Sequence, residues 1–359
     1  MNKSDKQCFT WLEQNNLTAV HDLNDQFTER HIGGIIFTSV LMVLGIFGNF
    51  AVLWKYTQRF KVSNYRTYTI WLAIMDITNC CIGMPFLIYY MSHYLTFPSD
   101  GLCKFGRFTM VFTTNSSYIL VVIAFDRYRK VCKPLKRQLT STNTKVCCIT
   151  ATILGLLTSW PCLILYGIYT DDTEIPGVKQ IRCWTDDDYK YTVYPKVYYI
   201  VLYIFNFLVL PILFIVYVQI LRFLHTHGKG GVRVKTKKTT ITLLAVSVAF
   251  LLSAIPHYSL VVTTRFQEDL NCKMTFAEGF FYYTFVFSIL LNNSVNPLIY
   301  GCLDTQFKRE IGNMFQICRK DIRDATSRID TQSMELDSRD PVPIYVNEHV
   351  QYSETNFND

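Results

Sequence analysis

Seven long apolar segments divide this chain, and each is long enough to cross a lipid bilayer as a helix. A membrane helix needs about 20 mostly apolar residues. One of the runs, Val197–Val218, contains a single plainly polar residue, and half of all residues are hydrophobic. Seven buried helices of a soluble core are the less favoured alternative. We therefore predict an all-α membrane protein, a seven-transmembrane helix bundle. The spans lie near residues 32–54, 68–92, 105–125, 146–168, 194–221, 239–263 and 279–302.

The distribution of positive charge predicts the orientation of the bundle. Lys and Arg gather in the loops after the first, third and fifth spans, whereas the opposite loops are mixed or acidic. By the positive-inside rule the N-terminus lies outside and the C-terminus in the cytoplasm. The net charge of +7 reflects this asymmetry, and we expect no nucleic-acid partner. The expected parts are an extracellular tail (1–31), the bundle (32–302), an amphipathic membrane-surface helix (303–323) and a disordered cytoplasmic tail (324–359).

The segment after the seventh span keeps a helical period. Phe307, Ile311 and Phe315 recur among basic residues, which indicates a short amphipathic helix on the inner leaflet. Cys318 there is a candidate palmitoylation site, with a free thiol as the alternative. The acidic tail beyond it has few apolar residues, so we expect disorder. Phosphorylation of its Ser and Thr residues by receptor kinases would add charge that arrestin reads.

Four of the twelve cysteines fall on the outer side: Cys8, Cys103, Cys183 and Cys272. An even number in an oxidising compartment predicts disulfides, and four cysteines allow three pairings. The tripeptide that begins at Asn16 is a glycosylation acceptor on the same side.

Polar residues and prolines interrupt several spans. Asp76 is an acid deep in an apolar run, and an intramembrane acid marks a functional site by default. Asparagines and a serine at comparable depth supply partners for it; a hydrogen-bonded core network is the alternative to an ion site. Prolines inside spans leave a carbonyl free and bend the helix. The polar partners are Asn49, Ser116, Asn292, Asn293 and Asn296, and the prolines are Pro85, Pro161, Pro211, Pro256 and Pro297.

Two motifs lie at the inner ends of spans. Asp126-Arg127-Tyr128 ends span three, and Asn296-Pro297-Leu298-Ile299-Tyr300 ends span seven. Together with further motifs in sequence order, they resemble the class A (rhodopsin-like) G-protein-coupled receptors over roughly residues 32–320. The further motifs are Gly48-Asn49, Leu72-Ala73-x-x-Asp76, Cys103 with Cys183, Phe250 with Pro256, and Asp304 to Phe307.

The resemblance implies roles for these residues. Arg127 would pair with Asp126 and be released when span six swings outward. Cys103 would pair with Cys183, which leaves Cys8 to join Cys272. The activation switch would comprise Asp126, Arg127, Tyr128, Phe250, Pro256, Asn296, Pro297 and Tyr300. The G protein would contact Arg127, Pro134, Leu135, Lys237 and Lys238. A sodium ion would be held by Asn49, Asp76, Ser116, Asn292 and Asn296. We expect no other metal and no other cofactor.

The chain departs from the family pattern at two tryptophan positions. Ala254 stands two residues before Pro256, where a tryptophan is usual, so the usual rotamer switch cannot operate. Ala151 replaces the usual tryptophan of span four. The distance from Cys103 to Arg127 is also one residue shorter than the common pattern.

Residue types that are missing from the spans narrow the possible classes of ligand. Span seven has no lysine between Phe280 and Tyr300, so retinal cannot form a Schiff base, and span three has no acid for an amine. An aromatic mouth with an acidic loop resembles the peptide-receptor branch, and the loop could steer a cationic ligand. Aromatic belts and a solvated loop are the structural alternatives. The expected ligand-binding residues are Thr109, Thr113, Trp184, Asp186, Asp187, His257, Tyr258, Arg265 and Tyr282.

The sequence thus predicts a plasma-membrane receptor for an extracellular peptide, such as a neuropeptide, that activates a heterotrimeric G protein. A receptor of the same fold for a lipid or other small molecule is the alternative. A channel or transporter is disfavoured because no inverted repeat or paired broken helices appear. No metalloprotease, nucleophile-elbow or paired-aspartate motif is present, so we expect no enzyme activity.

Overall fold

The computed structural model describes residues 20–109, 111–172, 179–227, 234–266 and 274–313 of the 359-residue chain. In these ranges, seven helical segments are long and apolar enough to cross a membrane. The predicted seven-span bundle is therefore confirmed. The segments are Val20–Arg59, Asn64–Ser92, Asp100–Cys132, Ser141–Leu165, Tyr194–Thr226, Thr236–Thr263 and Phe276–Leu303.

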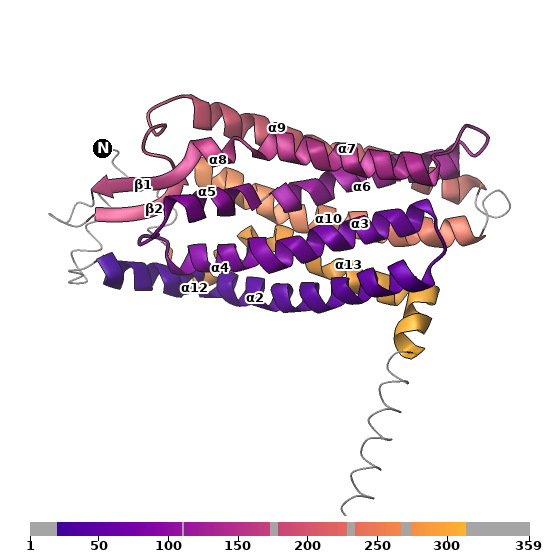
Figure 1. Cartoon of the computed structure of the whole chain (residues 1–359), viewed down its shortest axis with the longest axis horizontal. Coiled ribbons are helices and arrows are strands. Elements are labelled where there is room, and N and C mark those ends of the chain that lie inside the picture. Colours follow the sequence, from indigo (N-terminus) through magenta and orange to yellow (C-terminus); the bar gives the residue numbers. More distant parts are fainter. Residues whose placement is uncertain (1–19, 110, 173–178, 228–233, 267–273, 314–359) are drawn as a thin grey trace, which may run out of the picture. The chain divides into compact units, whose positions relative to one another are not determined.

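Several spans are built from more than one helix (Figure 1). The first span is α2 (Val20–Arg59), the fifth is α9 (Tyr194–His227) and the sixth is α10 (Val234–Phe266). The second span joins α3 (Asn64–Thr78), the π-helical turn η1 (Asn79–Gly83) and α4 (Met84–Ser92). The third joins α5 (Asp100–Thr109) and α6 (Val111–Cys132), and the fourth joins α7 (Ser141–Ser159) and α8 (Cys162–Leu165). The seventh joins α12 (Phe276–Val286), the 3-10 turn η2 (Ser288–Leu290) and α13 (Leu291–Leu303).

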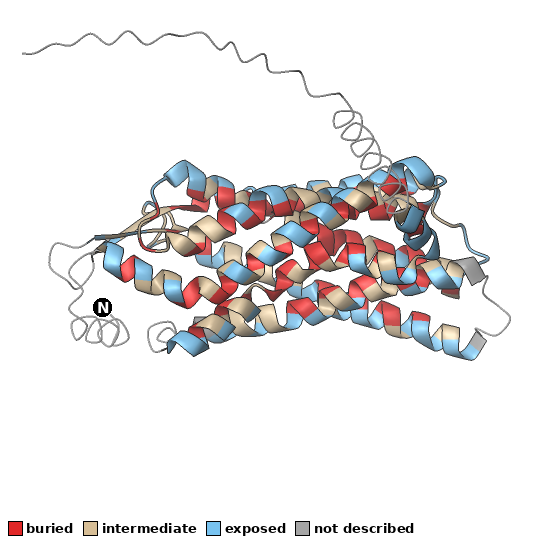
Figure 2. Ribbon diagram, turned by 90° about the horizontal axis from the view of Figure 1, so that it is seen from below, coloured by how far each residue is buried: buried red, intermediate tan, exposed pale blue. Residues whose placement is uncertain are grey.

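The third span lies at the centre of the bundle. Its inner half, α6, packs against α3, α7, α9 and α10, whereas α2 packs against α3, α4, α12 and α13. Figure 2 shows buried residues along the inward helix faces and exposed ones on the outside. Large apolar side chains such as Phe47 and Leu252 are among the exposed ones. A soluble protein rarely exposes so many, so this surface fits contact with lipid chains.

A β-hairpin replaces the last part of the predicted fourth span. The span was expected to reach residue 168, but the helix ends at Leu165, and β1 (Tyr166–Asp172) pairs antiparallel with β2 (Lys179–Thr185). Pro161 has no backbone N–H and separates α7 from the single turn α8. The alternating aromatic and β-branched residues that follow favour a strand. We call the end of the bundle that carries this strand pair the hairpin end.

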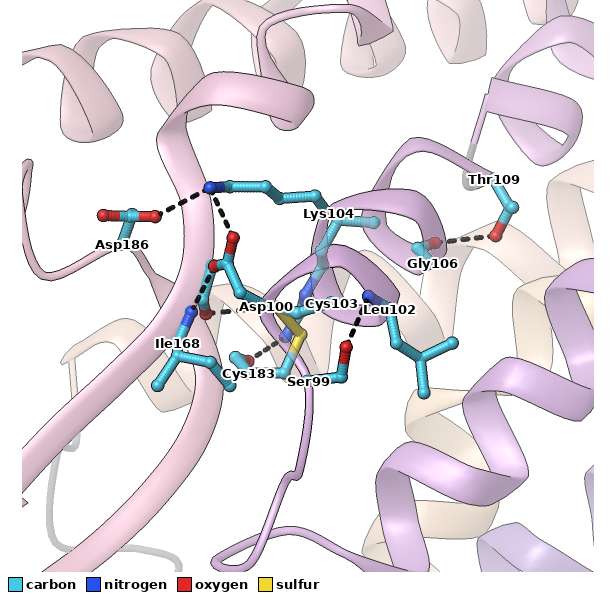
Figure 3. The surroundings of a disulfide bond; sticks show 12 residues. Ser99, Asp100, Leu102, Cys103, Lys104, Gly106, Thr109, Ile168, Cys183 and Asp186 are labelled. Carbon is cyan, nitrogen blue, oxygen red and sulfur yellow. Dashed lines mark hydrogen bonds and ion pairs between the residues drawn. A yellow bond between two sulfur atoms is a disulfide. The ribbon is translucent and has the colours of Figure 1, made fainter.

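The disulfide Cys103–Cys183 fastens the hairpin to the third span, as the resemblance implied. It joins α5 to β2 with Cα atoms 5.3 Å apart (Figure 3). Both cysteines are buried against Phe86 and Phe97. The hairpin is also bonded to the chain after α4, because the amide of Phe97 donates to the Ile181 carbonyl at 2.8 Å.

Some sequence predictions lie outside the described residues. These are the Cys8–Cys272 disulfide, glycosylation of Asn16, palmitoylation of Cys318 and the state of the tail. Residues 305–313 are helical, which fits the first part of the amphipathic helix expected over 303–323. The bundle forms one compact unit that ends at Lys308.

The first helix begins at Val20, well before the predicted edge of the span at residue 32. Asn24 explains the extra turns because its buried side chain bonds the chain after α4. Its amide nitrogen donates to the Ser92 carbonyl at 2.9 Å, and its oxygen accepts from the Leu95 amide at 3.0 Å. Leu23 packs against Leu95 beside this pair of bonds.

Replacing this asparagine should destabilise the bundle. Asn24→Ala removes both bonds and leaves the buried Leu95 amide unpaired, which should cost about 1–3 kcal/mol of unfolding free energy. Asp25→Ala, at the exposed neighbouring position, is the matched control. Thermal denaturation in detergent measures both. Equal melting temperatures for Asn24→Ala and the wild type would contradict this role for the helix extension.

Candidate functional site

A buried polar network surrounds Asp76 in the middle of the bundle. One carboxylate oxygen accepts from the side-chain amide of Asn293 at 2.9 Å and from the Ser116 hydroxyl at 3.4 Å; the other accepts from the Asn296 amide at 2.8 Å. The side-chain amide of Asn49 donates to the Asn293 carbonyl at 2.6 Å. The network therefore links spans one, two, three and seven.

Two asparagines of this region differ from expectation. Asn292 was expected beside Asp76, but the structure gives this place to Asn293, since consecutive helix residues point about 100° apart. Both amide atoms of Asn292 are buried without a hydrogen-bond partner in the described ranges. Sequence analysis missed Asn79, whose amide nitrogen donates to the Asn293 side chain at 3.0 Å and to the Thr113 hydroxyl at 3.1 Å. Its spacing of three residues from Asp76 on one helix is the signal that could have found it.

The residues around Asp76 fit a small hard cation. Such ions prefer oxygen ligands, above all carboxylates. Besides the Asp76 carboxylate, side-chain oxygens of Asn49, Asn292 and Asn296 are buried with no hydrogen-bond partner among the described residues. Because these oxygens accept no hydrogen bond in the described part of the chain, a cation bound to them would displace no donor from them.

A second polar network lies at the end of the bundle opposite the hairpin end, which we call the Arg127 end. The guanidinium of Arg127 forms a buried ion pair with Asp126. The same carboxylate binds the Lys130 ammonium at 3.0 Å and accepts from the Asn64 side-chain amide at 3.1 Å. Arg127 also donates to the Thr239 hydroxyl on α10 at 3.4 Å. This end of α10 is thus held to the third span by a polar contact.

Three further predicted switch residues, Phe250, Tyr300 and Tyr128, make contacts of their own. The Tyr217 hydroxyl on α9 lies 2.8 Å from the Ser247 hydroxyl on α10, and Phe250 is buried one turn further along. Tyr300 is buried, with its ring 5.9 Å from that of Tyr56. Tyr128 is partly exposed and its ring faces the Lys133 ammonium at 5.3 Å.

The region around Pro256 shows how the chain packs without the usual tryptophan. Ala254 is fully buried, and the turn η2 of span seven contacts α10 there. The Ser288 hydroxyl of η2 donates to the Ser253 carbonyl at 2.7 Å. A proline weakens helix hydrogen bonding in the turn before it. The Ser288 hydroxyl therefore ties span seven to α10 within that turn.

The acidic residues of the hairpin end are paired. Lys104 lies between Asp186 at 3.1 Å and Asp100 at 2.7 Å (Figure 3). Asp187 binds Lys190 at 3.1 Å, and this contact raises the pKa of the Lys190 ammonium. Two ammonium groups thus face three carboxylates, so part of the negative charge that the predicted acidic rim could use to steer a cationic ligand is neutralised.

The remaining predicted ligand-binding residues do not form one cluster. Thr109 is buried and donates to the Gly106 carbonyl, while Thr113 belongs to the network around Asp76. The ring of Tyr258 packs edge-on against Tyr203. His257 lies against the Val286 carbonyl, and Tyr282 lines a groove between α10 and α12. Trp184 lies near Arg107. The side chain of Arg265 is outside the described residues.

Four of the five predicted G-protein contact residues are exposed, whereas the fifth, Arg127, is buried. Leu135 is completely exposed in the loop between α6 and α7, and Pro134 beside it is exposed as well. Lys237 and Lys238 are exposed near the start of α10. An apolar side chain held fully in solvent contributes nothing to the core, so Leu135 is available to a partner.

The sequence is similar to that of known receptors. Residues 48–300 match the family model described as "7 transmembrane receptor (rhodopsin family)". The gonadotropin-releasing hormone II receptor of Clarias gariepinus is 26% identical over 302 residues, which cover 77% of each chain. The substance-K receptor of Bos taurus is 25% identical over 77% of this chain and 74% of its own. The substance-P receptor of Cavia porcellus is 25% identical over 78% of this chain and 70% of its own.

Removing the charge of Asp126 should loosen the Arg127 end. In Asp126→Asn the Arg127 guanidinium loses its ion pair, so α10 should move away from the third span more often. Spin labels at the exposed positions 135 and 238, on a background without other reactive cysteines, report this distance. We expect a longer and broader distribution than in the wild type. Asp188→Asn, which removes an exposed carboxylate at the hairpin end and keeps the ion pair, is the comparison variant. An unchanged distribution in Asp126→Asn would rule out that the Asp126–Arg127 pair restrains α10.

Proposed function

The chain belongs to the rhodopsin family of seven-transmembrane receptors, and we propose that it is a plasma-membrane receptor for an extracellular peptide that activates a heterotrimeric G protein. In this proposal the hairpin end faces the outside and the Arg127 end faces the cytoplasm. The basic loops at the Arg127 end support this orientation.

The observation that carries the proposal is the contact from Asp126 through Arg127 to Thr239. It holds α10 against the third span in a closed state. A ligand that binds the open state better shifts the population toward it. Opening separates Arg127 from α10 and uncovers the interior of the Arg127 end, where a G protein could insert.

The names of the relatives support the ligand class. Receptors for gonadotropin-releasing hormone, substance K and substance P each match over about three quarters of this chain. We carry over from them a peptide ligand. Arrestin and receptor kinases, acting on the tail outside the described residues, complete the proposed set of partners.

We further propose that sodium favours the closed state. Asp76, Ser116, Asn49 and Asn296 would hold the ion, and a bound cation would neutralise the buried carboxylate. Asp76 shares Asn293 and Asn296 with span seven, so fixing its charge would also fix the position of that span.

Leu135 provides a test of G-protein contact. On an Asp126→Asn background, which should signal without ligand, Leu135→Ser removes an exposed apolar contact. Losing the burial of a leucine should lower basal G-protein activation roughly 10- to 100-fold at equal surface expression. A panel of energy-transfer sensors for the G-protein classes measures this.

Val62→Ser is the matched control, because Val62 is also apolar and exposed, in the loop between α2 and α3. It should leave activation close to the parent. An equal loss of activation in both variants would mean that any exposed apolar residue at this end has the same effect. Unchanged activation in Leu135→Ser would show that Leu135 does not contact the G protein.

Sodium binding has its own test. A ligand bound only by the folded state raises the melting temperature. Purified wild type should melt higher in sodium chloride than in N-methyl-glucamine chloride at equal ionic strength, whereas Asp76→Asn should melt equally in both. Ser247→Ala should respond to sodium as the wild type does. A sodium effect that persists in Asp76→Asn would exclude this carboxylate as the ion's ligand.

A further inference from the structure

Arg107 occupies an unusual place at the hairpin end. It lies on α5, one helical turn beyond the disulfide cysteine Cys103. Its guanidinium carbon lies 4.8 Å from the ring centre of Tyr90, 5.4 Å from that of Tyr166 and 5.4 Å from that of Trp184. Three aromatic faces from span two and both hairpin strands therefore surround one cation.

The guanidinium has hydrogen-bonding capacity left over. One terminal nitrogen donates to the Cys183 carbonyl at 2.9 Å, and the guanidinium also hydrogen-bonds the Tyr90 side chain. The Nε atom is buried and has no acceptor among the described residues. Within the same ranges, no carboxylate forms an ion pair with Arg107. A guanidinium carries five N–H donors and no acceptor, so this side chain is incompletely satisfied.

The nearby acids are not available to Arg107. Asp186 and Asp100 share Lys104, which lies three residues before Arg107 on the same helix, and Asp187 is bound to Lys190. The positive charge at this depth is therefore uncompensated by those carboxylates. Aromatic faces attract a cation, but they do not accept the paired hydrogen bonds that a guanidinium forms best with a carboxylate.

We propose that Arg107, framed by Tyr90, Tyr166 and Trp184, is a subsite that binds a carboxylate group of the ligand. The inference rests on the proposed receptor function and names the chemistry of its ligand. In a peptide the carboxylate is either the free C-terminus or the side chain of Asp or Glu. The rigid fork of the arginine fixes its direction, and the rings pack against the carbon atoms beside it.

The subsite reverses the charge preference that the sequence predicted. The acidic hairpin suggested a cationic ligand, but Asp186 and Asp187 are paired with lysines. Arg107 lies inside the predicted span 105–125, where an arginine marks a functional site by default. That signal is present in the sequence.

Four matched compound pools test the subsite on cells that express the receptor, with G-protein sensors as the readout. The first pool holds short peptides with a free C-terminus and no Asp or Glu. The second holds amidated peptides that contain Asp or Glu, and the third holds amidated peptides without any carboxylate. The fourth holds fatty and aromatic carboxylic acids that are not peptides.

We expect agonists in the first or second pool. Replacing the carboxylate of such an agonist by the isosteric amide should lower its potency at the wild type roughly 10- to 100-fold, the range for a hydrogen bond to a charged group. In Arg107→Gln the acid and the amide should be equally potent, because the partner of the carboxylate is gone. Arg107→Lys keeps the charge and should retain part of the preference, which shows that the receptor is folded.

Lys104→Gln is the matched control. It removes a cation from the same helix, but one whose partners are acids of the protein. It should change the potency of acid and amide forms equally.

Two results would overturn the inference: agonists of the third pool as potent as those of the others, or an acid–amide difference that persists in Arg107→Gln. The first of these still supports a peptide receptor. Conversely, agonists from the fourth pool alone, inactive on Arg107→Gln, would support the carboxylate subsite and contradict the peptide ligand.

Discussion

The inability of lipid to hydrogen-bond governs this fold more than any other constraint. Every polar group on a membrane span must find its partner inside the bundle. Asp76 therefore accepts hydrogen bonds from spans three and seven, and Asp126 binds Asn64 of span two besides two cations of its own helix. The same bonds that stabilise the bundle also couple its helices. A helix end can move only if its polar groups exchange one set of partners for another, which gives the bundle discrete states.

The two ends of the bundle use different means of fixing helices. At the hairpin end, a disulfide, strand pairing and the Asn24 bonds hold α2, α4, α5 and the hairpin together. At the Arg127 end, α10 is held by side-chain contacts of Arg127 and Tyr217. Between them, Ser288 ties the turn before Pro256 to span seven. A cross-linked hairpin end, a bend at a proline and a polar contact at the Arg127 end suit a helix that pivots.

The sequence predicted the spans, their order and the Asp126–Arg127 pair because apolar length and motif order are local properties. It failed where partners come from distant segments. The start of α2 depends on Asn24 bonding to Ser92 and Leu95, and the end of α8 depends on Tyr166 entering a hairpin. Asn293 replaces Asn292 beside Asp76 because helix rotation, and not membrane depth, decides which side chain faces the carboxylate. The pairing of the hairpin acids with Lys104 and Lys190 was likewise invisible without the fold.

The central claim is that Arg127 links a closed bundle to a G protein. Guanine-nucleotide exchange on purified heterotrimeric G proteins, catalysed by the purified receptor in lipid nanodiscs, tests this claim most directly. We expect Asp126→Asn to accelerate exchange above the wild type. Arg127→Ala, if its melting temperature equals that of the wild type, should catalyse no exchange. Exchange by Arg127→Ala at the wild-type rate, or no exchange by Asp126→Asn on any class of G protein, would contradict it.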